Sequence, residues 1–175
     1  MKDVKKFENT VNIQYTVNVP LKINEVFDFF INNNQSKYYA NIAKGHKYFT
    51  LRQGEKMKIG SIIDCEESAG NQTIKHEYYV AEIINNERIY YYSKPSIIKI
   101  ALPWKIISSK SNSYVYYDFE EDKDLNTNIR ITIGIQFFSN GAKIFSTLVG
   151  GLEPWKKHCV EEMEGLKNIL MNKKK

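Results

Sequence analysis

The sequence predicts one α+β domain in which a curved antiparallel sheet wraps around a long C-terminal helix and encloses a cavity. Segments that alternate apolar and polar residues fill most of the chain, and a helical period replaces them near the C-terminus. No repeat, low-complexity stretch or linker divides the 175 residues, a length typical of one domain. We expect that domain to span 11–171, between a flexible N-terminus at 1–10 and a basic tail at 172–175.

The N-terminal part predicts a strand followed by a short helix. Alternation over 11–19 indicates the strand, which Pro20 ends. Apolar residues at helical spacing over 23–31 indicate the helix, with Asn24 as the candidate N-cap. The polar, aromatic-rich stretch that follows, as far as His46, shows no regular period.

Strands dominate the chain after Gly60, and turn residues separate them. The segment 95–103 is apolar but bracketed by prolines, which favours a lid or crossing loop over a central strand. The final helix is expected over 154–171, with a proline in its first turn. The predicted strands are 61–69, 73–84, 88–93, 114–120 and 128–138.

Charge and composition exclude several classes of protein. The net charge is +5, but the tail lysines 173–175 supply three of these charges, so no basic face for nucleic acid is expected. No apolar run is long enough to span a membrane or to form a signal peptide. Cys65 and Cys159 match no redox or zinc-ribbon spacing and are expected to be buried thiols in a cytoplasmic protein.

The final helix carries a carboxylate on its apolar side. Glu162 falls inside the apolar stripe, and His158 lies one turn earlier, so the two side chains can converge. A buried carboxylate is costly unless it is paired or binds a metal. The pair therefore has three interpretations: a structural hydrogen bond, a catalytic acid or base at Glu162, or half of a metal site.

Three further residues are candidates for the same place. In the strand 61–69, the more apolar face carries Glu67, which would enter the cavity and leave Glu66 in solvent; a shift of one residue would exchange them. His46 precedes the sheet and is either an exposed loop residue or a ligand. His76 is either a spare ligand, a substrate contact or a core histidine.

The two ends of the sequence resemble a known superfamily. The opening VNIQYTVNVPLKINEVFDFF and the closing EPWKKHCVEEMEGLKNIL resemble the START-like (SRPBCC) proteins. The resemblance covers nearly the whole chain and implies the helix-grip, or Bet v 1-like, fold. That fold hosts lipid carriers, aromatase/cyclases, receptors and hydrolases, so it leaves the function open.

A narrower resemblance concerns the candidate residues. GHKYFTLRQGEKMKIGSIIDCEES followed later by HxxxE is similar to the diacetylphloroglucinol hydrolase branch. That resemblance implies a zinc ion held by His46, Glu67, His158 and Glu162. It also implies hydrolysis of a carbon–carbon bond between an acyl group and a phenolic ring.

We therefore expect a zinc-dependent hydrolase of a small aromatic or polyketide-like acyl compound, with a metal-bound water as nucleophile and Glu162 as catalytic residue. The alternatives are a non-enzymatic carrier of a hydrophobic small molecule or lipid, and a metal-free polyketide cyclase with Glu162 as base. The partner is a small hydrophobic or aromatic ligand, not nucleic acid, and the chain is a monomer or homodimer. The residues expected to line the substrate pocket are His76, Tyr78, Tyr90, Tyr92, Tyr114 and Tyr116.

Overall fold

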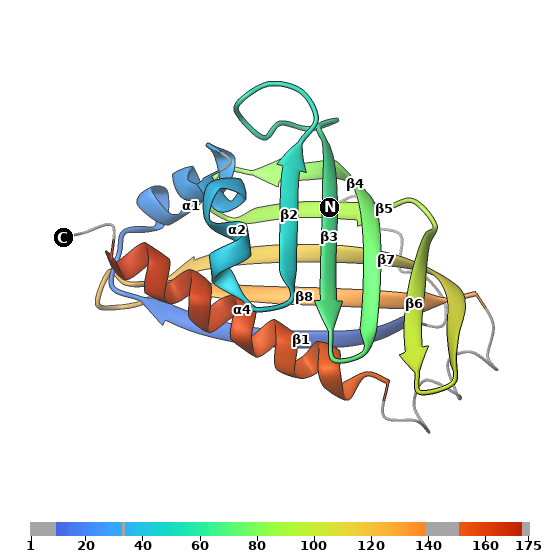
Figure 1. Cartoon of the computed structure of the whole chain (residues 1–175). Helices are drawn as coiled ribbons and strands as arrows, with labels where there is room; N and C mark the ends of the chain where they lie inside the picture. Colours follow the sequence, from blue (N-terminus) through green and yellow to red (C-terminus); the bar gives the residue numbers. More distant parts are fainter. Residues whose placement is uncertain (1–9, 33, 139–150, 173–175) are drawn as a thin grey trace.

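The structure is a computed structural model that describes residues 10–32, 34–138 and 151–172. An antiparallel sheet of eight strands curves around one long helix (Figure 1). Of the predicted flexible N-terminus at 1–10, the structure describes only Thr10, and of the predicted basic tail at 172–175 it describes only Asn172. The elements are β1 (Thr10–Val19), α1 (Ile23–Ile31), α2 (Asn34–Ile42), β2 (His46–Leu51), β3 (Ile62–Ala69), β4 (Gln72–Ile84), β5 (Arg88–Ser93), β6 (Ser96–Leu102), β7 (Lys105–Glu121), β8 (Thr127–Phe137) and α4 (Glu153–Asn172).

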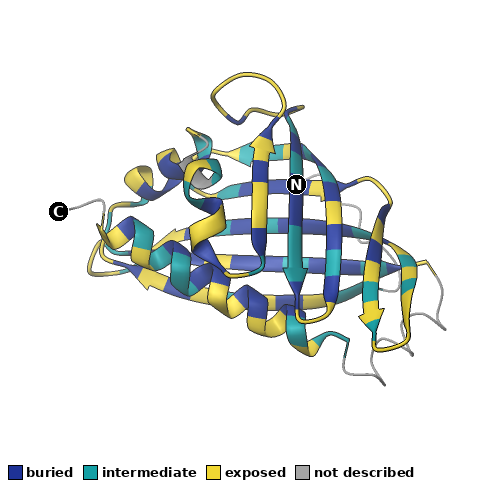
Figure 2. Ribbon diagram, in the orientation of Figure 1, coloured by how far each residue is buried: buried dark blue, intermediate teal, exposed yellow. Residues whose placement is uncertain are grey.

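The sheet order is β1-β8-β7-β5-β4-β3-β2, so the first and last strands of the chain meet at one edge. Helix α4 packs mainly against β1 and α2 and crosses the concave face of the sheet. Buried residues alternate along the strands and also cover one side of α4 (Figure 2). None of the described helices is long and apolar enough to cross a membrane.

Helix α1 has the predicted bounds but a different start. Its N-cap is Lys22, and the backbone N–H of Lys22 donates to Oε2 of Glu25 at 3.2 Å. The prediction of Asn24 as cap was wrong, because Glu25 lies three residues after Lys22 and accepts that otherwise unpaired N–H.

Helix α2 and strand β2 were not predicted. The register of β2 against β3 shifts between His46 and Tyr48, which is a β-bulge. As a result His46 and Phe49, three residues apart, both point inward, and period-two alternation is lost. His46 therefore begins a strand of the sheet and does not lie in a loop before it.

The segment 95–103 was predicted as a lid or crossing loop, and this was wrong. It contains β6, which pairs with β4 and β7 and continues the row that β5 begins. Pro95 lies at the break between β5 and β6, and Pro103 lies in the turn between β6 and β7. Both prolines thus occupy positions where the ladder needs no N–H.

The core forms between the concave face and α4. Both cysteines are buried and free, as predicted. The largest wholly buried side chain is that of Tyr117, in the C-terminal part of β7. On α4 the buried residues are Trp155, His158, Cys159, Glu162, Met163, Leu166 and Leu170.

Candidate metal centre

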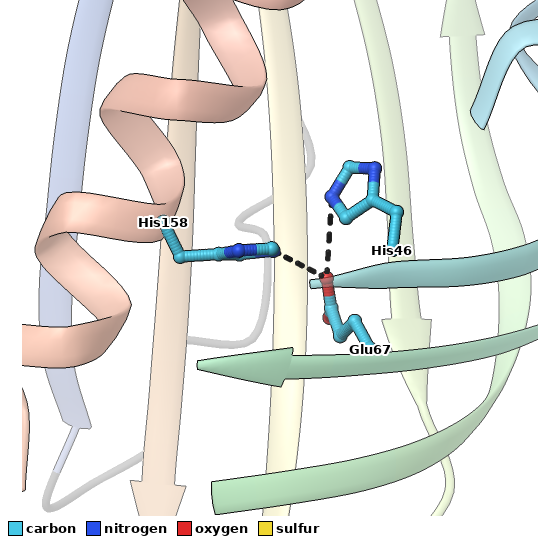
Figure 3. A group of neighbouring side chains, drawn as sticks. All are labelled: His46, Glu67 and His158. Atoms are coloured by element: carbon cyan, nitrogen blue, oxygen red, sulfur yellow. Dashed lines mark hydrogen bonds and ion pairs between the residues drawn. The ribbon is translucent and has the colours of Figure 1, made fainter. Parts of the chain in front are cut away.

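Three side chains from three elements converge at one end of the cavity. His46 begins β2, Glu67 lies opposite it in β3, and His158 projects from α4. One potential ligand atom from each residue lies within 4.8 Å of the other two. Both imidazole rings point toward the carboxylate of Glu67 (Figure 3).

The close packing of β2, β3 and α4 brings these side chains together. Gly45 lies against both β3 and α4. A Cβ at this position would stand 1.8 Å from the carbonyl oxygen of Ser68 and 2.9 Å from Cε1 of His158. The carbonyl oxygen of Gly45 also accepts the backbone N–H of Ser68 at 2.8 Å. Only glycine permits this approach, so Gly45 is a residue of the site that the sequence pattern alone did not indicate.

His46 presents one unpartnered nitrogen to the centre of the site. Its Nδ1 lies 3.0 Å from the backbone carbonyl oxygen of Tyr39. Because a carbonyl oxygen can only accept a hydrogen bond, Nδ1 carries a proton and donates it. The ring also stacks on the Tyr39 ring, with centroids 3.8 Å apart. Nε2 is then the nitrogen that carries the lone pair when the ring is neutral, and it is buried with no hydrogen-bond partner among the described residues. This arrangement is typical of a metal-ligating histidine, whose other nitrogen is held by a carbonyl group.

Glu67 supplies the oxygen that both histidines face. Its Oε2 lies 3.3 Å from Nε2 of His158 and 3.9 Å from Nε2 of His46. Burial opposes ionisation, but the hydrogen bond from His158 and the nearby histidines lower the pKa of Glu67 to about 2. Burial also disfavours the charged form of His158, but the bond to Glu67 outweighs it and raises the pKa of His158.

Glu162 lies beside this group. Its Oε2 is 4.0 Å from Nε2 of His46, while its Oε1 accepts a hydrogen bond of 2.8 Å from the hydroxyl of Tyr117. The carboxylate is thus buried, anchored through one oxygen and directed toward the site through the other. It stands next to the three converging residues and is not one of the group whose ligand atoms lie within 4.8 Å of one another.

The spacing fits a zinc ion. Tetrahedral bonds of about 2.1 Å separate neighbouring ligand atoms by about 3.4 Å. The two distances from Oε2 of Glu67, 3.3 and 3.9 Å, are close to that value, and all three ligand atoms lie within 4.8 Å of one another. Nε2 of His46 faces carboxylate oxygens at 3.9 and 4.0 Å and has no hydrogen-bond partner among the described residues, so a cation between these atoms would stabilise the cluster.

The cavity beside the site has a volume of about 40 Å³. Its wall is mostly aromatic and aliphatic, and Glu67, His158 and Glu162 form its polar end. His158 also borders an open surface groove of about 640 Å³ that Gly45, Ser68 and residues of α4 line. The site therefore lies between the interior cavity and the surface.

His76 and Tyr78 line the cavity, where they were expected. Nδ1 of His76 lies 3.1 Å from the hydroxyl of Ser96, and its Nε2 lies 3.9 Å from Oε1 of Glu67. Burial lowers the pKa of His76 to about 4, so its ring is neutral at pH 7. The hydroxyl of Ser113 donates to that of Tyr78 at 3.0 Å.

The other tyrosines predicted to line the pocket lie on the opposite face of the sheet, and their prediction was wrong. The ring of Tyr90 stacks on that of Tyr116 at 4.3 Å, and Tyr92 is partly exposed. Both faces of β5 carry aromatic residues, so the sequence gives no contrast between inside and outside. The tyrosines that do line the cavity, and that sequence reasoning missed, are Tyr39, Tyr91 and Tyr117.

The structure also separates the two adjacent glutamates. Glu66 faces away from the cavity and forms ion pairs of 2.7 Å with Lys47 and 2.9 Å with Lys75. Hydrogen bonds from these two lysines lower the pKa of Glu66 to about 2. Glu67 is the residue that lines the cavity.

Comparisons with known proteins identify the architecture. No family model and no curated protein matches the sequence. The structure is similar to TTHA0849 from Thermus thermophilus, with 10% identity, a TM-score of 0.66 and coverage of 94% of this chain and 100% of that one. It is also similar to ginseng major latex-like protein 151 from Panax ginseng, with 11% identity, a TM-score of 0.55 and coverage of 86% and 97%.

A third similar structure is BexL, a di-domain ARO/CYC from the BE-7585A biosynthetic pathway, with 16% identity and a TM-score of 0.60. The match covers 94% of this chain but 50% of BexL, so this chain spans half of its length. The fold is the helix-grip fold. The predicted helix-grip architecture is therefore confirmed, and identities this low extend no further than the fold.

Proposed function

We propose that the protein binds a zinc ion on His46, Glu67 and His158 and hydrolyses a small aromatic or polyketide-like acyl compound in the cavity. The observation that carries the proposal is the buried Nε2 of His46, which has no hydrogen-bond partner among the described residues, while Nδ1 of the same ring is held by a carbonyl oxygen. Two histidine nitrogens and a carboxylate oxygen are a donor set that zinc prefers. A zinc ion bound there would polarise a carbonyl group and lower the pKa of a bound water.

Glu162 is the residue suited to move a proton in this reaction. Its Oε1 is held by Tyr117, and its Oε2 is free to accept a proton from water at the site. In the hydrolysis the hydroxyl of water adds to the acyl carbon, the carbon–carbon bond to the ring breaks, and the ring carbon takes up a proton. Glu162 can return the accepted proton to that carbon.

The cavity restricts which compounds can bind. No Lys or Arg is among the described residues that line it, and its polar end carries two carboxylates, which favours a neutral ligand over an anionic one. A cavity that holds benzene has about 150 Å³, against about 40 Å³ here. Binding of a ring therefore requires the lining side chains to move apart.

A metal-free cyclase is the second candidate, and the bond between Tyr117 and Glu162 favours it. That bond orients a buried carboxylate without any metal, so Glu162 could act as general base on a polyketide chain. Sensitivity to a chelator separates the two candidates. The hydrolase loses its activity in chelator, whereas the cyclase keeps it.

Zinc titration by calorimetry, together with metal analysis of the purified protein, tests the site. We expect one zinc ion per chain in the wild type and none in His46→Ala or His158→Ala. His76→Ala is the matched control, because it removes a buried histidine from the same cavity and should retain zinc. Failure of the wild type to bind zinc, or equal binding by His46→Ala, would contradict the proposed site.

The reaction is tested with acylated phloroglucinols as probes, whose free acid and deacylated ring can be separated by chromatography. We expect release of both products by the zinc-loaded protein, and a loss of about 10²–10⁴-fold in Glu162→Gln, the usual contribution of a general base. Zinc binding without turnover of any acylated ring would contradict the reaction and leave the metal site standing.

A further inference from the structure

The hairpin of β6 and β7 carries exposed apolar side chains on the side of the sheet away from the cavity. Trp104 in its turn is 77% exposed, Ile106 is 69% exposed and Ile97 is 50% exposed. Strand β8 pairs with β7 only from Ser111 onward, so residues 105–110 pair with β6 alone among the described strands. The hairpin thus forms one end of the sheet, with exposed residues along it (Figure 2).

The register of the hairpin gathers these residues on one face. Ile97 lies opposite Lys110, and Lys99 lies opposite Ser108. Nearer the turn, Ala101 lies opposite Ile106. Directly opposed residues point to the same side of an antiparallel pair, and all six are exposed. Their face is the outer one, because the alternate residues Ile98 and Ser111 line the cavity.

The charge of the hairpin has one sign. From residue 88 to residue 117 the sequence contains no Asp or Glu. Lys94 forms an ion pair with Glu77, which leaves Lys99 and Lys110 on the outer face and Lys105, opposite Leu102, beside the turn. No carboxylate lies within ion-pair distance of these three lysines among the residues that the structure describes.

We propose that this outer hairpin face, defined by Ile97, Lys99, Ile106 and Lys110 together with Trp104 and Lys105 at the turn, docks on an anionic lipid surface. Tryptophan favours the interface between water and acyl chains, and isoleucine favours the apolar region below it. Each lysine near the surface is attracted by anionic headgroups. The proposal is independent of the metal site.

Other partners fit this face less well. The cores of protein interfaces are depleted of lysine and serine, both of which are present here among the apolar residues. Single-stranded nucleic acid is held by several aromatic rings and by arginine, whereas this face has one ring, two isoleucines and no arginine. Because β6 and β7 also form part of the cavity wall, docking would bring that wall to the lipid.

Tryptophan fluorescence of the full chain with lipid vesicles tests the proposal. The chain has two tryptophans, and Trp155 is buried, so a vesicle-dependent change reports on Trp104. We expect a blue shift and co-sedimentation with vesicles of equal parts phosphatidylcholine and phosphatidylserine, and much weaker binding to phosphatidylcholine alone. Binding should weaken with added salt, because the lysines lie in solvent.

Two variants separate the apolar and the charged contributions. Trp104→Ser/Ile106→Ser, which lacks the fluorescent reporter, should lose co-sedimentation with the anionic vesicles. Lys99→Glu/Lys105→Glu/Lys110→Glu should weaken binding at least about a hundredfold, since each lysine contributes about fivefold. The matched control Lys56→Glu/Lys58→Glu/Lys123→Glu makes the same change in net charge at exposed lysines elsewhere and should keep most of the binding.

Three results would overturn the proposal. One is the absence of binding to the anionic vesicles by wild type that circular dichroism shows to be folded. Another is equal binding by the two hairpin variants and the wild type. The third is a dimer in light scattering that Trp104→Ser dissociates, which would assign the face to a second copy of the chain.

Discussion

The hydroxyl of Tyr117 donates a hydrogen bond of 2.8 Å to Oε1 of Glu162, and both side chains are buried. The bond joins strand β7 of the sheet to the long helix α4 across the cavity. It satisfies one oxygen of a carboxylate that would otherwise be costly to bury, and it directs the other oxygen toward His46. One hydrogen bond thus both stabilises the fold and orients the candidate base.

Tyr117→Phe should therefore destabilise the protein by about 1–3 kcal/mol, because it leaves a buried carboxylate oxygen without its donor. The ring itself, which packs on Phe30 with centroids 4.7 Å apart, is retained. The matched control is Tyr15→Phe, which removes a partly buried hydrogen bond of 3.0 Å to Glu164 of the same helix. Urea denaturation measures both; equal effects of the two variants would contradict a special role for the buried bond.

Gly45→Ala should weaken zinc binding, although Gly45 is not itself a ligand. The added methyl group would meet the carbonyl oxygen of Ser68 and the ring of His158, so β2 must move away from both. We expect a loss of about 1–3 kcal/mol in stability and a loss of about 10–100-fold in zinc affinity, the range for residues that orient ligands.

Gly134→Ala is the control for that variant. Its methyl group would meet the ring of Tyr114, with Cζ only 2.0 Å away, on the outer face of the sheet. It should also destabilise the protein, but zinc affinity should stay within about twofold of wild type because no candidate ligand contacts it. If both variants lost zinc to the same extent, the loss would reflect general destabilisation.

The pattern of the sequence determined most of the fold. Strands β1, β3, β4 and β5 and both predicted helices have regular periods, and their observed bounds agree with the predicted ones within one or two residues. The failures have local causes. The bulge after His46 interrupts the period-two alternation of β2. Pro95 lies between β5 and β6, and a proline there reads as the end of a strand, although β6 continues the same row of the sheet.

The candidate site was predictable where a polar residue interrupts an apolar face. Glu162 and His158 stand out on α4 for this reason, and so does Glu67 on β3. The tyrosines are different, because β5 and β7 carry them on both faces, and a ring suits either a cavity wall or a partly exposed sheet surface. Gly45 and Tyr39 could not be found from the sequence, because their roles depend on contacts between elements far apart in the chain.

The outer tyrosines should act on stability and not on the cavity. The ring of Tyr114 covers Gly134, and its hydroxyl donates to Oδ1 of Asn12 at 2.7 Å. Tyr114→Ala should cost about 2–4 kcal/mol, because it uncovers a strand glycine and removes a nearly buried ring. Tyr114→Phe, which keeps the ring, should cost less than about 1.5 kcal/mol. The zinc affinity of both variants should match that of wild type. A changed affinity in either would mean that the outer face of the sheet contributes to the metal site.

The ion pairs around Glu77 should make stability depend on acid pH. Hydrogen bonds from Lys94, Tyr79 and Arg52 lower the pKa of Glu77 to about 2, whereas a glutamate in the unfolded chain has a pKa of about 4.3. A carboxyl whose pKa is depressed by folding stabilises the protein above its unfolded pKa, and this contribution is lost as the pH falls toward the folded pKa. The window for this group is therefore from about pH 4.3 down to about pH 2.

Glu77→Gln removes that titration and is the variant to compare. At pH 6 the urea midpoint of wild type should be higher than that of Glu77→Gln. The difference between the two midpoints should shrink as the pH is lowered from about 4.3 toward about 2, over the range in which both proteins are folded. Because Arg52 and Lys94 are largely in solvent, the difference at pH 6 should also shrink in high salt. A difference that stays constant with both pH and salt would mean that Glu77 acts through packing and not through its charge.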